Sequence, residues 1–122
     1  MFELTINGQV YKFNFGMGFM REINARLKKP IDGIPNEKEN IGLQFRIAGV
    51  LSGDVESLVE VLECANKGQD PRITRELLDN HIDNVDTNID ELFDKVIDFL
   101  KKTNATRKMT QKIMDVYAKQ NQ

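Results

Sequence analysis

The sequence has one cysteine, one histidine and no long hydrophobic run, and each shortage excludes a class of protein. Cys64 has no second cysteine with which to form an internal disulfide, and no apolar run typical of a signal peptide opens the chain. Charged or amide side chains interrupt every apolar segment before the roughly 20 residues that a membrane helix needs. We therefore expect a reducing, cytoplasmic environment and no membrane partner.

The charges are nearly balanced. The 17 lysines and arginines stand against 19 aspartates and glutamates, which gives a formal net charge of -2 at pH 7. Domains that bind nucleic acid usually carry a clear excess of Lys and Arg, so nucleic acid is not an expected partner.

A chain of 122 residues is long enough to bury a hydrophobic core that is stable without disulfide bonds or a bound metal ion.

The N-terminal residues predict a β-hairpin. Asn7-Gly8 favours the positive backbone angles of a two-residue turn, and it lies between residues 2–6 and 9–13, in which apolar residues alternate. The resulting register gives apolar and opposite-charge pairs: Phe2 with Phe13, Leu4 with Tyr11, and Glu3 with Lys12. An isolated hairpin is marginally stable in water, so its apolar face must pack on the helices that follow.

Hydrophobic residues recur at helical spacing in the rest of the chain. The expected helices cover about residues 17–29, residues 41–51, segments that begin after Asp54 and after Thr74, about residues 88–102, and a last segment from Ala105. Between the first two helices, Pro30, Gly33 and Pro35 predict an exposed loop. The sequence thus predicts a mainly α fold of the α+β class, with an N-terminal β-hairpin packed on a bundle of about five to six short helices.

Capping signals mark three of the helix starts. Asp54 and Thr74 are suitable N-caps, while Thr87 and Asp90 have the spacing of a capping box. The stripe expected to be buried in the helix after Asp54 is Val55, Leu58, Val59 and Leu62. In the helix over residues 88–102 it is Ile89, Leu92, Phe93, Val96, Ile97 and Leu100.

We expect two parts in this fold. Residues 1–104 form the hairpin and helical core, and residues 105–122 form a basic C-terminal helix that is either loosely attached or partner-binding. Residues 70–98 contain nine acids against three bases, whereas the chain from Lys101 onward contains six bases against Asp115 alone. The basic tail can fold back on the acidic helices of its own chain, or contact those of another copy in a head-to-tail assembly.

The acidic run DNHIDNVDTNIDELFDKVID, residues 79–98, could suggest a metal site. It lacks the glycine at the sixth position that a calcium loop of the EF-hand type needs, and Asp90, Asp94 and Asp98 recur every fourth residue, which is typical of the solvated side of a helix. His81 is the only histidine, and Cys64 is expected to be a buried small side chain rather than a reactive thiol. We expect no catalytic, cofactor or metal site.

Three segments carry a family resemblance by their order and spacing. They are FELTINGQVYKFNFGMGFMREIN at residues 2–24, GLQFRIAGVLSGDVESLVEVLECA at residues 42–65, and NIDELFDKVIDFLKKTNATRK at residues 88–108. Together they resemble the tail assembly chaperone family of long-tailed, siphovirus-type phages and prophages of Gram-positive bacteria. The resemblance extends to about Lys108, and the segment from Met109 to Gln122 matches no pattern of the family.

The resemblance implies a non-enzymatic assembly factor that acts in the host bacterial cytoplasm and is not expected in the mature virion. Members of the family bind the tape measure protein that sets tail length, keep it soluble, and are shed as tail-tube subunits polymerise around it. The implied partners are the tape measure protein, the tail tube protein and further copies of the chain. The alternative is a small regulatory or nucleic-acid-binding module that uses the basic C-terminal helix, although Tyr117 is its only aromatic residue for base stacking.

A chaperone for a helix-rich partner needs apolar surface that can be covered and uncovered reversibly. The residues that we expect to supply it are Met109, Ile113, Met114, Val116 and Tyr117 of the C-terminal segment, with Phe19 and Met20 near the N-terminus. The alternative for Phe19 and Met20 is ordinary core packing.

Overall fold

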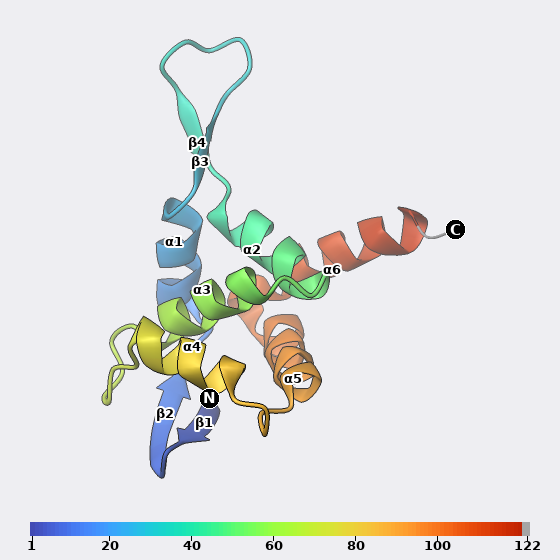
Figure 1. The fold of residues 1–122 in the computed structure, drawn as a ribbon. Coiled ribbons are helices and arrows are strands. Elements are labelled where there is room, and N and C mark those ends of the chain that lie inside the picture. The colour runs from blue at the N-terminus through green and yellow to red at the C-terminus, as the bar shows by residue number, and fades with distance from the viewer. Residues whose placement is uncertain (121–122) are drawn as a thin grey trace.

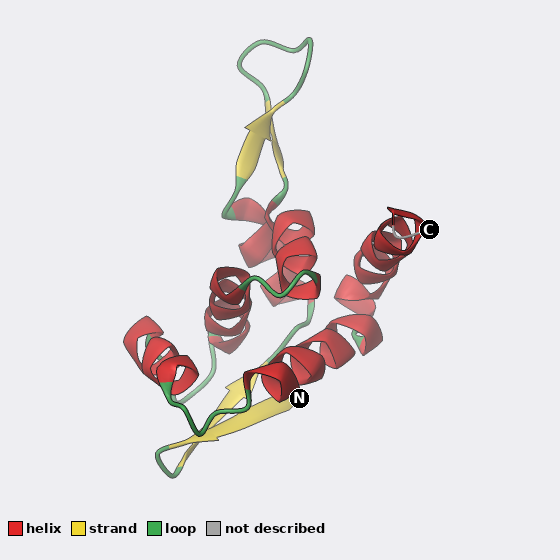
Figure 2. Ribbon diagram, turned by 45° about the vertical axis from the view of Figure 1, so that its right-hand side comes forward, coloured by secondary structure: helices red, strands yellow, loops and turns green. Residues whose placement is uncertain are grey.

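A computed structural model describes residues 1–120 of the chain (Figure 1). Its elements, in order, are β1 (Phe2–Ile6), β2 (Gln9–Phe13), α1 (Met17–Ala25), β3 (Lys28–Pro30), β4 (Lys38–Asn40), α2 (Gly42–Leu51), α3 (Val55–Asn66), α4 (Arg75–Asp83), α5 (Ile89–Lys102) and α6 (Asn104–Gln120). The helices form the body, and the two hairpins lie at opposite ends of it (Figures 1 and 2). The predicted mainly α fold with an N-terminal hairpin is confirmed.

The N-terminal hairpin has the predicted register. The expected pairs face each other across the strands: Phe2 with Phe13, Leu4 with Tyr11, and Glu3 with Lys12. Asn7 and Gly8 form the turn with φ values of 53° and 80°, which a type I′ turn requires. The Phe2 ring packs edge-on against Phe13 at 5.5 Å and against Phe99 of α5 at 5.3 Å, so the apolar face of the hairpin rests on α5.

Helix α3 lies at the centre of the core. Elements β2, α1, α2 and α4 all pack on it. Its buried residues are Ser57, Leu58, Val59, Val61, Leu62, Cys64, Ala65 and Asn66. The prediction that Val55 belongs to the buried stripe is wrong, because the first turn of the helix extends past the core: Val55 is 42% exposed, and burial begins at Ser57.

The N-cap of α5 differs from the prediction. The capping box of Thr87 and Asp90 does not form: Asn88 is the N-cap and accepts a hydrogen bond from the Glu91 N–H at 3.0 Å. Thr87 instead donates its hydroxyl to the carbonyl of His81 at 2.6 Å. Asn is a stronger N-cap than Thr, so the side chain of Asn88 takes the role of N-cap in place of Thr87. The buried stripe of α5 is centred on Leu92, Val96 and Leu100, as expected.

The segment between α1 and α2 forms a hairpin that the sequence pattern did not indicate. Helix α1 ends at Ala25 rather than near residue 29, and Lys28–Pro30 pairs with Lys38–Asn40. Pro30 favours an extended backbone at the residue before it, which opposes a longer helix. The connecting loop is exposed apart from Ile31, and the whole hairpin projects from the body (Figure 1).

The two helices that flank this hairpin cross closely at Gly42. A Cβ atom at this position would lie 1.9 Å from the carbonyl oxygen of Ile23 in α1. Across the same crossing, the Leu43 N–H donates to the side-chain oxygen of Asn24 at 3.2 Å. Only glycine allows the two backbones to approach this closely.

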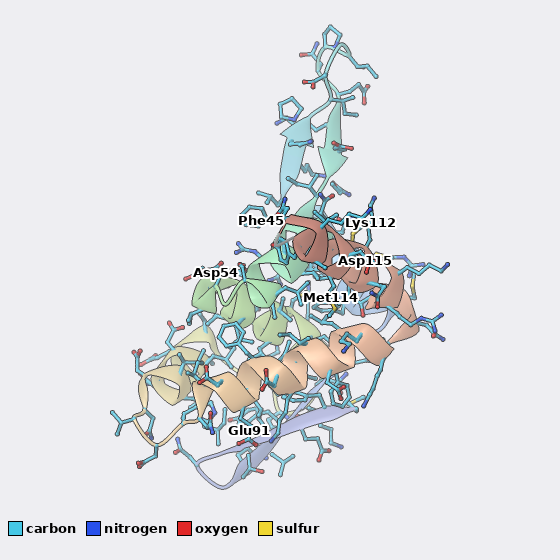
Figure 3. All side chains as sticks on the ribbon, turned by 90° about the vertical axis from the view of Figure 1, so that its right-hand side faces the viewer. Phe45, Asp54, Glu91, Lys112, Met114 and Asp115 are labelled. Carbon is cyan, nitrogen blue, oxygen red and sulfur yellow. The ribbon has the colours of Figure 1, made fainter. Side chains whose placement is uncertain are left out.

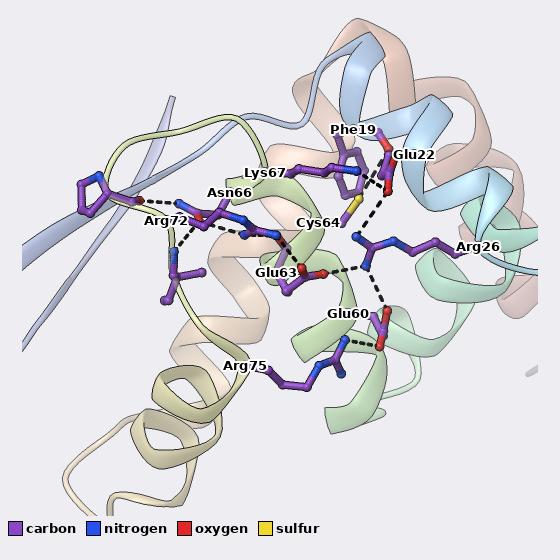
Figure 4. A network of polar contacts seen from close by, with 12 residues as sticks. Phe19, Glu22, Arg26, Glu60, Glu63, Cys64, Asn66, Lys67, Arg72 and Arg75 are labelled. Atoms are coloured by element: carbon purple, nitrogen blue, oxygen red, sulfur yellow. Dashed lines mark hydrogen bonds and ion pairs between the residues drawn. The ribbon is translucent and has the colours of Figure 1, made fainter.

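Asn66 at the end of α3 is fully buried and makes four hydrogen bonds. Figure 4 shows it beside Arg72. Its NH₂ group donates to the carbonyls of Lys12 at 2.9 Å and Pro71 at 3.2 Å. Its oxygen accepts from the Ile73 N–H at 2.6 Å and from the Arg72 guanidinium at 3.0 Å. One side chain therefore joins β2, α3 and the segment that precedes α4.

Arginines and glutamates connect α1, α3 and α4 on one side of the body (Figure 4). Arg26 pairs with Glu60 at 3.3 Å and with Glu63 at 2.6 Å. Arg75 pairs with Glu60 at 2.6 Å, and Arg72 pairs with Glu63. Burial raises the pKa of the Glu63 carboxyl, but hydrogen bonds and charge from Arg26 and Arg72 outweigh it, so that pKa lies below its usual value. The network therefore stabilises the fold while Glu63 is ionised.

We predict that Gly42→Ala lowers the free energy of unfolding by about 2–3 kcal/mol, because backbone atoms of Ile23 must move to make room for a methyl group. Urea unfolding followed by circular dichroism measures the change. Gly18→Ala in α1 is the matched control: no atom lies within 4 Å of its added Cβ, and alanine favours helix, so its effect is neutral or stabilising by up to about 1 kcal/mol. Equal destabilisation by both variants would contradict the close crossing.

We predict that Glu63→Gln lowers the free energy of unfolding at pH 7 by about 1–2 kcal/mol, since two arginines lose an ionised partner. A carboxyl with a lowered folded pKa contributes stability above its unfolded pKa, and this contribution is lost as the pH falls through the folded pKa. The variant should therefore show a shallower loss of stability than the wild type between about pH 5 and pH 3.

The control for this titration is Glu56→Gln. The Glu56 side chain is 69% exposed and contacts only Arg75, at 3.5 Å, in the network. Its substitution should leave the pH profile of the wild type nearly unchanged. Parallel loss of stability in the wild type and in Glu63→Gln would show that the acid sensitivity has another source.

Candidate partner-binding surface

The predicted C-terminal helix is α6, and it packs on α5 and α2. Thr106 and Thr110 are fully buried, and their hydroxyls donate to the carbonyl of Leu100 at 2.7 and 3.3 Å. Near the other end of the helix, the Tyr117 hydroxyl donates to the carbonyl of Ala48 in α2 at 3.1 Å. One face of α6 thus rests on the body and the other faces solvent. Residues 121–122 of the predicted segment lie outside the described residues.

A shallow, mostly apolar hollow of about 210 Å³ lies between α2 and α6, and we call it the α2–α6 groove. Its lining consists of Gln44, Ala48, Met109, Lys112, Ile113, Val116 and Tyr117. Val116 is 45% exposed at its edge, and the neighbouring Phe45 of α2 is 51% exposed. Figure 3 views the molecule from this side, with Phe45 and Lys112 labelled on the two helices. The groove therefore has an apolar floor next to apolar side chains that water still reaches.

Four of the predicted partner-binding residues meet in this groove, namely Met109, Ile113, Val116 and Tyr117. Met114 is also on α6 but is half-buried and outside the lining. Phe19 and Met20 belong to α1 instead. Phe19 is only 5% exposed, its ring packs edge-on against Phe15 at 5.2 Å, and Met20 is half-buried against the same core. These two side chains offer little surface to a partner.

The contribution of α2 to the groove was not expected from the sequence. Gln44 and Ala48 lie one helical turn apart and so share a face. That spacing is visible in the sequence, but which distant helix covers the face is set by tertiary packing.

The exposed face of α6 is basic, whereas α4 and α5 expose mainly acidic side chains. Arg107, Lys108, Lys112 and Lys119 are exposed, and none of them takes part in an ion pair within residues 1–120. The α5 pairs are local, such as Lys95 with Glu91 at 2.8 Å. Helix α6 contacts α5 through the hydroxyls of Thr106 and Thr110, and no ion pair joins the two helices within residues 1–120. The two oppositely charged surfaces therefore both face solvent.

A second, more polar hollow of about 510 Å³ lies between β1, α4 and α5, and we call it the β1 cleft. Its lining consists of Leu4, Thr5, Ile6, Asn7, Leu77, Asn80, His81, Asn84, Asp86, Thr87, Asn88, Glu91, Leu92 and Lys95. Burial lowers the pKa of His81, so the imidazole is neutral at pH 7. Of the aspartates in residues 79–98, Asp86 alone belongs to this lining.

Cys64 is buried on α3, and its thiol lies 3.9 Å from the carbonyl oxygen of Phe19. Burial raises the pKa of the thiol to about 11, so it is protonated at neutral pH and behaves as a core side chain. Within residues 1–120, no group of three or more His, Cys, Asp or Glu side chains is placed to hold a metal ion. No helix in that range has the length and apolar character needed to cross a membrane.

Comparison with known proteins identifies the family. A family model described as "Phage tail assembly chaperone protein, TAC" matches residues 3–115. No curated protein and no solved structure matches the chain. The family match begins in β1, includes both hairpins, and continues into α6 past Met109 and Ile113 of the α2–α6 groove. The chain belongs to the phage tail assembly chaperone family.

Proposed function

We propose that the protein binds the tape measure protein of its phage during tail morphogenesis, through the α2–α6 groove, and that it does so without catalysing a reaction. The observation that carries this proposal is the apolar hollow at the junction of two helices, with the exposed side chain of Val116 in its lining. Phe45, the residue after Gln44 in α2, is also exposed. In a member of this family, such a surface is the strongest candidate for contact with an aggregation-prone chain.

The groove has the chemistry that one face of a partner helix requires. Apolar side chains at i, i+3, i+4 and i+7 of an amphipathic helix can fill an apolar groove between two helices. The Met109 side chain is flexible and can adapt to different partner side chains, whereas Tyr117 is fixed by its hydrogen bond to Ala48. Lys112 in the lining adds a positive charge for an acidic residue beside the apolar stripe.

We also propose that the protein forms a homo-oligomer in which the basic face of α6 contacts the acidic face of α4 and α5 of the next copy. Such a contact joins two different surfaces, so it repeats head to tail. Tail tube protein is the second proposed partner. The chaperone contacts it when tail-tube subunits polymerise around the tape measure protein and displace the chaperone. The proposed location is the host bacterial cytoplasm, with no place in the mature virion.

We predict that Val116→Asp abolishes rescue of the tape measure protein, because it puts a charge at the edge of the apolar groove. The measurement is the soluble fraction of the tape measure protein from the same phage genome, co-expressed with each variant. Val85→Asp is the matched control: Val85 is 96% exposed in the connection between α4 and α5, so the same change there should leave rescue intact. Equal loss in both variants, or full rescue by Val116→Asp, would contradict the groove as the binding site.

We predict that the purified protein sediments as a species larger than 14.0 kDa at about 50 mM NaCl and dissociates at about 500 mM NaCl, because salt screens the charges between copies. Lys108→Glu should weaken the assembly at low salt. A single species of 14.0 kDa at every salt concentration would contradict the oligomer. Salt-dependent binding of mixed-sequence DNA by the wild type would instead support the alternative nucleic-acid module.

A further inference from the structure

No strand of residues 1–120 lies beside the outer edge of β1. The residues that exchange hydrogen bonds in this two-residue hairpin are the pairs Ile6 with Gln9, Leu4 with Tyr11, and Phe2 with Phe13. The N–H and C=O groups of Glu3 and Thr5, which fall between these pairs, therefore point away from β2. No other described residue, among residues 1–120, forms a hydrogen bond with those four backbone groups.

The opposite edge of the same hairpin is covered at its end away from the turn. The Lys12 carbonyl, which points outward from β2, accepts a hydrogen bond from Asn66 at 2.9 Å. Just past the strand, the Asn14 N–H donates to the Ala65 carbonyl at 2.8 Å. The end of α3 thus protects β2 from Lys12 onward, whereas the β1 edge stays unpaired at both Glu3 and Thr5, and another chain can add a strand to such an edge.

This unpaired edge borders the β1 cleft. The lining includes Leu4, Thr5, Ile6 and Asn7, which are consecutive in the chain. Neighbouring side chains of a strand point to opposite faces of the sheet. A hollow lined by all four residues therefore follows the edge of the strand rather than one face of the hairpin. Helices α4 and α5 form the opposite wall of this hollow. In Figure 2 the hairpin lies below these two helices.

The cleft walls are acidic and contain apolar contacts. Lys95 is neutralised by Glu91 at 2.8 Å, which leaves Asp86 as the unbalanced charge of the lining. Leu77 and Leu92 contribute apolar surface. Glu3 adds a second exposed carboxylate next to the open edge, and Lys12, which faces it across the hairpin, forms no ion pair with it among residues 1–120. The site therefore offers backbone groups for pairing, carboxylates for basic side chains, and leucines for apolar ones.

We propose that the edge of β1 binds an extended, basic protein segment as an added strand. Backbone pairing with Glu3 and Thr5 supplies the affinity, and basic side chains that face Glu3 and Asp86 supply the selectivity. This site is separate from the α2–α6 groove and takes a partner in a different conformation. It therefore goes beyond the proposed capture of a helical tape measure segment.

A fluorescent peptide of alternating lysine and valine is the probe. We expect saturable binding by fluorescence anisotropy, together with slower amide hydrogen exchange at Glu3 and Thr5 in NMR spectra of the full chain. Absence of binding at millimolar protein would overturn the proposal. Binding that Val116→Asp abolishes would also overturn it, because the peptide would then occupy the α2–α6 groove.

A proline pair tests the edge itself. Thr5 and Val10 face each other across the hairpin at positions whose N–H groups point outward, so proline at either removes no hydrogen bond between β1 and β2. Thr5→Pro should weaken peptide binding at least about 10-fold, whereas Val10→Pro, the matched control on the β2 edge, should leave it unchanged. Equal weakening by both variants would overturn the proposal.

Changes in the peptide keep the test decisive even if Thr5→Pro does not fold. A peptide methylated at alternate backbone nitrogens cannot form the backbone hydrogen bonds with β1. A peptide with glutamate in place of lysine is repelled by the carboxylates of the site. Both should bind wild-type protein at least about 10-fold more weakly than the probe. Unchanged affinity of the methylated peptide would exclude strand addition, and unchanged affinity of the glutamate peptide would exclude recognition of basic side chains.

Discussion

Burial of the Asn66 amide at the end of α3 is the constraint from which the arrangement around it follows. A buried amide without partners is costly, so the segments that supply its four hydrogen bonds are held in fixed places. These segments are β2, α3 and the chain before α4, which are distant in the sequence. Because the end of α3 covers β2 at Lys12 and Asn14, the hairpin leaves its β1 edge more open than its β2 edge. The ion pair of Arg72 with Glu63 strengthens the same junction between α3 and the segment before α4.

The two surfaces proposed for binding differ in chemistry as well as in place. The α2–α6 groove is apolar and framed by helices, its lining includes Lys112, and the same helix α6 exposes further basic side chains. The β1 cleft is lined by amides and carboxylates and borders unpaired backbone groups. The first suits side chains of a helix that has already formed, and the second suits a segment without internal backbone hydrogen bonds. A chaperone with both could engage its clients before and after they become helical.

Local patterns determine how much of this structure could be predicted. Asn7-Gly8 fixes the register of the N-terminal hairpin because its turn geometry leaves only one pairing, and Asp54 and Thr74 cap their helices as their side chains predict. Asn88 shows the limit of such patterns, since adjacent residues compete for one cap. The β3–β4 hairpin was missed because its strands are short and fully exposed, so no apolar alternation marks them.

Only part of the candidate site could be predicted from the sequence, for a related reason. Helical spacing identifies the face of α6 that carries Met109, Ile113, Val116 and Tyr117, but Gln44 and Ala48 join it only through the packing of α2. Phe19 lies in the core although its residue type and spacing suit a surface patch equally well.

The projecting β3–β4 hairpin is constrained less by core packing than the helices are. Its loop carries almost none of the core, so insertions, deletions and sequence drift there cost the body little stability. Evolution is thus free to lengthen or reshape this arm while the helices beneath it keep their form.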